Sequence, residues 1–229
     1  IMKNKITIAI DGPAGSGKST VAKRVAEVLG VLYLDTGAMY RAVTLKALQA
    51  GISPTDGEKL AALAAETDLA FVRTGDGAYH LFMDGQDVSM EIRSAPVTRN
   101  VSAVSAISKV REVLVKQQQI IARQGGVVMD GRDIGAVVLP QADLKIFLTA
   151  SLEERARRRW LELKAKGFSG TQEEIAEDLK RRDAFDAGRA ISPLKPAPDS
   201  IIVDTSTMGI EEVVARILTL ASSVSGQED

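Results

Sequence analysis

Short apolar runs alternate with amphipathic helical patterns along most of this chain. KITIAI (5–10), VLYL (31–34), GGVVMD (125–130), LKIFL (144–148) and SIIVD (200–204) are predicted as strands. Helices are predicted over 18–29, 37–50 and 210–221, the first with valines and a leucine on one face and ending at Gly30. Apolar strands that alternate with helices are typical of a parallel sheet in a layered α/β fold.

One region departs from this alternation. LAFVR and YHLFM are two alternating strands joined by TGDGA, and a second turn, DGQDV, follows them. Helical patterns over 95–104 and 107–124 come next. An antiparallel hairpin within a parallel-sheet chain indicates an inserted subdomain. We therefore predict a core formed by 1–66 and 105–229 and an insert over 67–104.

Two features of the composition limit the chemistry, namely the charge balance and the missing residue types. The 229 residues carry a formal net charge of −1, so the chain as a whole is no cationic binder of nucleic acid or membrane. There is no cysteine, which excludes thiolate catalysis and zinc–thiolate sites, and His80 is the only histidine. No apolar run is long enough for a membrane span, and no secretory signal pattern is visible, so a cytoplasmic protein is expected.

The first predicted strand runs into DGPAGSGKST, which matches the pattern G-x-x-x-x-G-K-[ST]. Glycines at these positions let successive backbone N–H groups surround phosphate oxygens, and the following helix adds its positive dipole end. Lys18 is expected to reach the β- and γ-phosphates, and the Ser19 hydroxyl is expected to bind Mg²⁺. The nucleotide-binding candidates are Gly12, Pro13, Ala14, Gly15, Ser16, Gly17, Lys18, Ser19 and Thr20.

Arginines and one acid lie where phosphoryl transfer would use them, because that reaction depends on positive charge more than on an enzyme nucleophile. The candidate arginines are Arg41, Arg93, Arg132, Arg182 and Arg189, of which the last two would share a helix face if the helix extends that far. Each alone also suits a surface ion pair. Asp130 ends a buried strand, as an acid that supports Mg²⁺ would, although an aspartate also suits the start of a turn.

Other P-loop proteins remain as alternatives at this point. A small-molecule kinase acting on a shikimate-like polyol would be shorter and would lack a hairpin insert with its own arginine. A GTPase switch would carry N-K-x-D late in the chain, but the only NK is Asn4–Lys5, without the aspartate. A transporter-type ATPase would carry L-S-G-G-Q, which is missing.

Several motifs together resemble the bacterial cytidylate kinases of the nucleoside monophosphate (NMP) kinase group. They are ITIAIDGPAGSGKST, YLDTGAMYRAV, DVSMEIR, DGRDIG, KIFLTAS with ERARRR, and RDAFDAGRAISPL, spread over residues 5–221. The resemblance implies a P-loop core around a five-stranded parallel sheet flanked by helices, an NMP-binding insert with the hairpin, and a short lid near 157–170. It also implies transfer of the ATP γ-phosphoryl group to CMP or dCMP with Mg²⁺, in a monomer.

The same resemblance implies roles for individual residues. It places Arg111 and Asp133 at the base of CMP, with the Ser102 hydroxyl near the exocyclic amine. Thr36 and Arg41 would also hold CMP, and Arg93 would approach its phosphate. Arg132, Arg182 and Arg189 correspond to phosphate-binding, catalytic arginines, beside Lys18. Asp186 corresponds to a carboxylate near the ribose hydroxyls.

Overall fold

The computed structural model describes residues 6–75, 79–165, 167 and 169–225, which form two compact units. Unit 1 comprises Ile1–Tyr33 and Gly125–Asp229, and unit 2 comprises Leu34–Gln124. The predicted insert, residues 67–104, falls within unit 2, and its boundaries as a functional subdomain stay a prediction. Each unit is described by itself.

A five-stranded parallel sheet forms the centre of unit 1, as the alternating pattern predicts. Its strands are β1 (Thr7–Asp11), β2 (Leu32–Asp35), β6 (Val127–Gly131), β7 (Leu144–Thr149) and β8 (Ile201–Asp204), in the order β2-β6-β1-β7-β8. The predicted positions of all five are confirmed to within two residues at each end. The chain passes from unit 1 to unit 2 within β2.

The pairing of β1 with its two neighbours determines which loops meet. β1 pairs in parallel with β6, which sets Asp11 opposite Gly131, and with β7, which sets Asp11 opposite Phe147. Ile8, Ala9 and Ile10 of β1 are fully buried. Because parallel strands end at the same edge, the segments that follow β1, β6 and β7 lie side by side, at the edge where open α/β sheets bind ligands.

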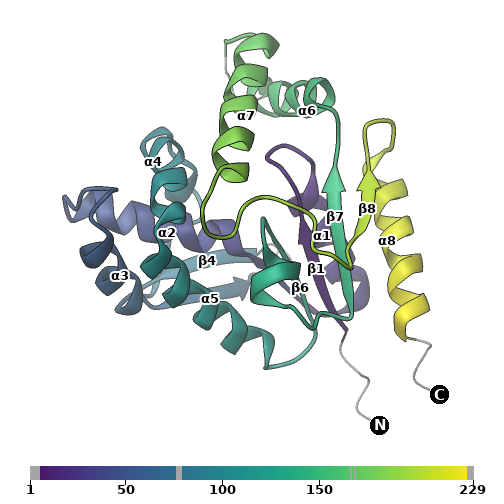
Figure 1. The fold of residues 1–229 in the computed structure, drawn as a ribbon, viewed down its shortest axis with the longest axis horizontal. Helices are drawn as coiled ribbons and strands as arrows, with labels where there is room; N and C mark the ends of the chain where they lie inside the picture. Colours follow the sequence, from purple (N-terminus) through teal and green to yellow (C-terminus); the bar gives the residue numbers. More distant parts are fainter. Residues whose placement is uncertain (1–5, 76–78, 166, 168, 226–229) are drawn as a thin grey trace. The chain divides into compact units, whose positions relative to one another are not determined.

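Helices cover this sheet and extend beyond its edge. α1 (Lys18–Leu29) and α8 (Ile210–Ser225) pack together beside the strands (Figure 1). α6 (Leu152–Ala165) and α7 (Gln172–Ala187) pack against each other after β7. A π-helical turn, Ile134–Val138, follows β6 and contacts β1.

Unit 2 combines a small antiparallel sheet with helices. β3 (Leu69–Arg73), β4 (Tyr79–Met83) and β5 (Gln86–Asp87) are its strands, and β5 was too short to show as a pattern. The helices are α2 (Thr36–Gln49), α3 (Gly57–Ala65), α4 (Ala95–Ala106) and α5 (Ser108–Ala122), with a 3₁₀ turn at Glu91–Arg93. The predicted hairpin is confirmed, while residues 76–78 of its first turn lie outside the described residues.

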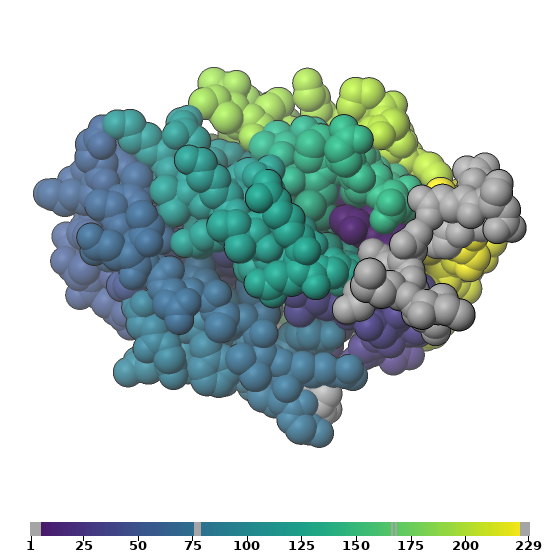
Figure 2. Space-filling view, turned by 90° about the horizontal axis from the view of Figure 1, so that it is seen from below, coloured from purple at the N-terminus to yellow at the C-terminus, as the bar shows by residue number. Residues whose placement is uncertain are grey.

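The core of unit 2 lies between its sheet and α2. Leu81 and Met83 of β4 pack with Ala42 and Leu45 of α2 and with Ile92. On β3, Ala70, Val72 and Arg73 are exposed, and the blue part of the chain that includes this hairpin lies at the surface in Figure 2. Within the described residues of either unit, no helix is both long and apolar enough to cross a membrane.

Candidate active site

The loop between β1 and α1 has a backbone that only glycine permits. Gly12 has a φ of 155°, and a Cβ atom there would lie 2.1 Å from the carbonyl oxygen of Leu148 in β7. Gly15 and Gly17 also have positive φ values, 75° and 86°. These glycines wrap the loop tightly against the end of the sheet, so its backbone N–H groups are close enough to surround an anion.

The start of α1 has the polar groups of a phosphate site. No described side chain caps this helix N-terminus, and Gly17 occupies the N-cap position. The hydroxyl of Ser16 is buried without a hydrogen-bond partner among the described residues. Lys18 is buried too, and its Nζ donates to the Pro13 carbonyl at 3.2 Å, which folds the lysine back over the loop. A phosphate group would satisfy the buried hydroxyl and the helix end together.

Ser19 and Asp130 meet although they are far apart in the sequence. The Ser19 hydroxyl donates to Asp130 Oδ2 at 2.7 Å, and the Tyr33 hydroxyl donates to Asp130 Oδ1 at 2.9 Å. Asp130 is buried near the end of β6. A hydroxyl and one carboxylate are hard oxygen ligands of the kind Mg²⁺ uses together with substrate phosphates and water. The donor set therefore fits this ion, and no cluster of three metal-binding side chains occurs among the described residues.

Asp186 joins two of the predicted arginines. Arg132, just after β6, donates from Nε to Asp186 Oδ2 at 2.8 Å, and Arg189 donates from Nη2 to Asp186 Oδ1 at 2.5 Å. Burial lowers the pKa of the nearby Arg182, and the positive charge of Arg132 lowers it further. Asp186 balances only one of the two charges of Arg132 and Arg189, and Arg182 lies close enough to Arg132 for their charges to repel. Positive charge therefore gathers in a half-buried place, which suits a phosphoryl group.

The helix that carries Arg182 is shorter than its spacing to Arg189 requires. α7 ends at Ala187, so Arg189 lies beyond the helix, and the condition for a helix face shared with Arg182 is not met. Asp186 nevertheless holds Arg189 close to Arg132. The ion pairs of Asp186, and not helical periodicity, bring Arg189 close to Arg132.

A buried arginine that sequence reasoning missed connects the loop to the next helices. Arg155 in α6 donates to the carbonyls of Ala14, at 2.9 Å, and Ala150, at 3.0 Å, and pairs with Asp183 of α7 at 2.7 Å. Ala14 also packs in an apolar cluster with Leu179 of α7. The first arginine of ERARRR is thus a link between the phosphate loop and α7.

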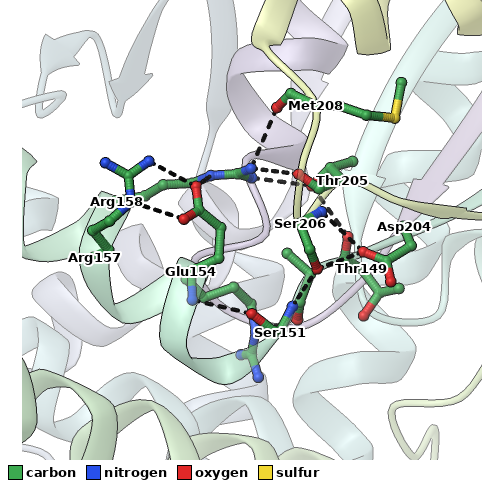
Figure 3. A network of polar contacts seen from close by, with 11 residues as sticks. Thr149, Ser151, Glu154, Arg157, Arg158, Asp204, Thr205, Ser206 and Met208 are labelled. Carbon is green, nitrogen blue, oxygen red and sulfur yellow. Dashed lines mark hydrogen bonds and ion pairs between the residues drawn. The ribbon is translucent and has the colours of Figure 1, made fainter.

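A polar network connects the start of the predicted lid to the loop after β8 (Figure 3). Glu154 binds Arg157 through both carboxylate oxygens and Arg158 at 2.7 Å. Arg158 in turn donates to the hydroxyl and the carbonyl of Thr205, at 3.0 and 2.5 Å. The hydrogen bonds from Arg157 are the largest cause that lowers the pKa of Glu154 to about 2. The predicted lid, 157–170, therefore begins inside α6, and residues 166 and 168 lie outside the described residues.

In unit 2, Arg41 lies close to the segment that carries Arg93. Arg41 Nη1 donates to the Ile92 carbonyl at 3.1 Å and to the Thr98 hydroxyl at 3.0 Å. Arg93 is largely exposed, and its Nη2 lies 3.8 Å from Asp35 Oδ2. Thr36 is buried as the first residue of α2. The structure thus brings two predicted phosphate-binding arginines into one part of unit 2.

Arg111 lies in a buried place on α5. Its Nη1 donates to the Ser105 carbonyl at 3.1 Å, and its guanidinium lies 5.4 Å from the centre of the Tyr40 ring. Ser102 is half-buried on α4, one turn before Ser105. Arg111 is therefore held in a fixed position by a carbonyl and an aromatic face.

Asp133 follows Arg132 in unit 1 and is also buried. Asp11, which sequence reasoning missed, holds the next two backbone N–H groups, at Ile134 and Gly135. Its signal was the same one that marked Asp130, an acid at the end of a buried strand.

Comparison with known proteins gives one consistent result. The sequence model of the family described as cytidylate kinase matches residues 8–223. A cytidylate kinase of Desulfitobacterium hafniense (strain Y51) is 54% identical over 219 residues, covering 96% of this chain and 94% of that protein. A cytidylate kinase of Bacillus subtilis (strain 168) is 50% identical over 217 residues, covering 95% and 96%.

Among solved structures, an uncharacterized protein from Eubacterium ventriosum ATCC 27560 is similar in fold. Its TM-score is 0.54 at 13% identity, and the match covers 96% of this chain and 99% of that one. At this identity the likeness bears on the fold alone.

Proposed function

The chain belongs to the cytidylate kinase family, which makes it an ATP-dependent kinase of CMP, and we propose how its residues carry out this transfer. The γ-phosphoryl group passes from ATP to the phosphate of CMP, giving ADP and CDP. We extend the acceptors to dCMP, and we propose that the protein works as a monomer in the cytoplasm, on nucleotides and not on nucleic acid or membrane.

The juxtaposition of Ser19 with Asp130 carries the proposal for the donor side. Residues 12–20 bind the phosphates of ATP through their backbone N–H groups, and the Ser16 hydroxyl gains a partner there. Lys18 turns from the Pro13 carbonyl to the β- and γ-phosphates. Its charge is most useful when the bond to the leaving oxygen breaks, because negative charge then accumulates on ADP.

Ser19 and Asp130 are the residues that would hold Mg²⁺. When bound, this ion neutralises charge on the β- and γ-phosphates. The hydrogen bond from Tyr33 keeps the Asp130 carboxyl group oriented toward the place where a cation would bind.

We propose that Arg132, Arg182 and Arg189 contact the phosphoryl group in transit. Phosphoryl transfer is accelerated mainly by positioning and by positive charge at the equatorial oxygens. Asp186 supports this role indirectly, because it holds Arg132 and Arg189 at 2.8 and 2.5 Å. We also propose that Asp186 contacts the ribose hydroxyls.

The acceptor is recognised by its base and by its phosphate. Cytosine offers an N4–H₂ donor beside the N3 and O2 acceptors. A carboxylate at Asp133 accepts from N4–H₂, and Arg111 donates to N3 or O2. Ser102 adds a hydroxyl near the amine, and Thr36, Arg41 and Arg93 bind the rest of CMP.

A panel of acceptors tests this function. ADP formation from ATP is measured with CMP, dCMP, UMP, AMP and shikimate, each with and without Mg²⁺. We expect efficient turnover with CMP and dCMP, loss of turnover without Mg²⁺, and weak turnover with UMP. Equal or better turnover of shikimate or AMP would contradict the proposed acceptor site.

A further inference from the structure

Asp11 forms a two-point contact with the backbone that follows β6. Its Oδ1 accepts a hydrogen bond from the Ile134 N–H and its Oδ2 accepts one from the Gly135 N–H, both at 2.8 Å. Asp11 is only 4% exposed. Both oxygens of a buried carboxylate are therefore used to hold one short stretch of chain, 123 positions away.

This contact acts on the residue just before it. The Ile134 N–H belongs to the same planar peptide unit as the Asp133 carbonyl, so fixing that N–H also fixes the ψ angle of Asp133, which is 25°. The Asp133 carbonyl accepts from the Val137 N–H at 2.9 Å. The peptide unit between Asp133 and Ile134 is therefore held by hydrogen bonds at both its carbonyl and its N–H group.

The contact is electrostatically costly. Burial raises the pKa of Asp11 to about 6 although both backbone hydrogen bonds lower it, and the neighbouring Asp133 raises it further while Lys18 lowers it. A neutral acceptor would hold an N–H at a smaller desolvation cost. A carboxylate, by contrast, holds two adjacent N–H groups at once and fixes the direction of the chain.

We propose that Asp11 is a positioning residue for acceptor recognition, which fixes the backbone that presents Asp133 to CMP. This inference rests on the proposed contact of Asp133 with the base. Without the two hydrogen bonds the turn shifts, and Asp133 loses its alignment with the cytosine amine.

Asp11→Asn is the most informative substitution. The asparagine side chain keeps the shape of aspartate but has one acceptor oxygen, and its NH₂ group would face one of the two N–H donors. Asp11→Ser is a second variant, smaller and with a single oxygen. Asp143→Asn is the matched control, because Asp143 accepts from the Thr7 N–H at the opposite end of β1.

The experiment combines amide hydrogen exchange at Ile134 and Gly135 with kcat and KM for CMP, UMP and ATP. All variants are measured where their circular dichroism matches that of the parent chain. We expect faster exchange and a CMP-over-UMP preference that falls by about 10- to 100-fold in both Asp11 variants, chiefly through KM for CMP. KM for ATP should change by less than about threefold, and Asp143→Asn should keep the parent preference.

Asp133→Asn and the double variant Asp11→Asn/Asp133→Asn separate this inference from the proposed function. We expect the double variant to show no lower preference than Asp133→Asn alone, since both changes remove one contact. If Asp133→Asn lowers the preference and the Asp11 variants do not, only the role of Asp11 is overturned. If Asp133→Asn leaves it unchanged, the base contact itself is wrong and the inference falls with it. Failure of both Asp11 variants to fold would make Asp11 a structural residue and would also overturn the proposal.

Discussion

The Ser19 hydroxyl donates a hydrogen bond of 2.7 Å to Asp130, across 111 positions of sequence. The contact follows from the strand order, because β1 and β6 are neighbours in the sheet and end at the same edge. The loop after β1 and the acid near the end of β6 therefore meet without any long side chain between them.

This relationship predicts that Asp130→Asn weakens the response to Mg²⁺. The amide is uncharged and supports a cation poorly, so the Mg²⁺ concentration for half-maximal rate should rise by at least about tenfold. The measurement is a Mg²⁺ titration of the initial rate at saturating ATP and CMP. KM for CMP should stay near that of the parent chain, and an unchanged Mg²⁺ response would exclude Asp130 from the metal site.

Lys18→Ala should lower kcat by about 100-fold or more, because the lysine charge matters most as the phosphoryl bond breaks. Binding of CMP, followed by isothermal titration calorimetry without ATP, should survive. Lys23→Ala is a suitable control, since Lys23 lies in the same helix about one and a half turns further on. Near-normal turnover by Lys18→Ala would contradict the P-loop assignment.

The sheet was predictable because each strand is a short apolar run that ends at a turn signal. β5, with two residues, has too few positions to show an alternation. The nucleotide loop was predictable for a local reason as well, since its glycines, lysine and serine lie within eight consecutive positions.

Contacts between distant segments could not be predicted in the same way. The role of Arg155 depends on the Ala14 carbonyl, 141 positions away, and on Asp183 in another helix. From the sequence alone, a run of arginines in a helix predicts a solvent-exposed face, because the packing of the helix is not known. Asp186 likewise joins Arg132 to Arg189 through the fold, beyond the end of α7.

Asp11 should make stability depend on pH. Its pKa is about 6 in the folded chain against 3.8 for an ordinary aspartate, so the fold favours the protonated form. A carboxyl with a raised pKa contributes stability that is present below about pH 4 and is lost as the pH rises through about 6. The shift corresponds to about 3 kcal/mol in the free energy of unfolding.

Urea unfolding of the parent chain and of Asp11→Asn across this pH range isolates that contribution. The free energy of unfolding of the parent chain should fall relative to the variant as the pH rises from about 4 to about 7. Other carboxylates titrate in both proteins and cancel in the difference. Parallel curves for the two proteins would mean that Asp11 titrates normally in the folded chain.

Discrimination between CMP and UMP should change differently when each of the two proposed base contacts is removed. Asp133→Asn replaces an acceptor by an amide that also donates, so CMP activity should fall while the UMP-to-CMP ratio of kcat/KM rises by about tenfold or more. Arg111→Met removes a donor and supplies no new partner, so CMP should suffer with less gain for UMP. Equal losses with both substrates in Asp133→Asn would mean that Asp133 does not contact the base.

Arg155→Met should disturb stability and ATP binding together. The change removes the donor of the Ala14 carbonyl and leaves Asp183 without its partner. One oxygen of Asp183 is already buried without a hydrogen bond among the described residues, so the loss should cost about 3 kcal/mol in the free energy of unfolding. KM for ATP should rise by about tenfold because the phosphate loop is no longer held in place.

The double variant Arg155→Met/Asp183→Leu distinguishes a specific link from general packing. Removing both charges leaves no unpaired carboxylate, so the double variant should regain stability relative to Arg155→Met, with a coupling of about 2 kcal/mol between the two sites. KM for ATP should stay high, because the Ala14 carbonyl still lacks its donor. Arg157→Met serves as the control, since Arg157 is an exposed residue of the same helix. Additive losses of stability in the double variant would show that Arg155 and Asp183 stabilise the chain independently. If KM for ATP returned to the parent value along with stability, ATP binding by the phosphate loop would depend on the stability of the chain and not on the bond from Arg155 to Ala14.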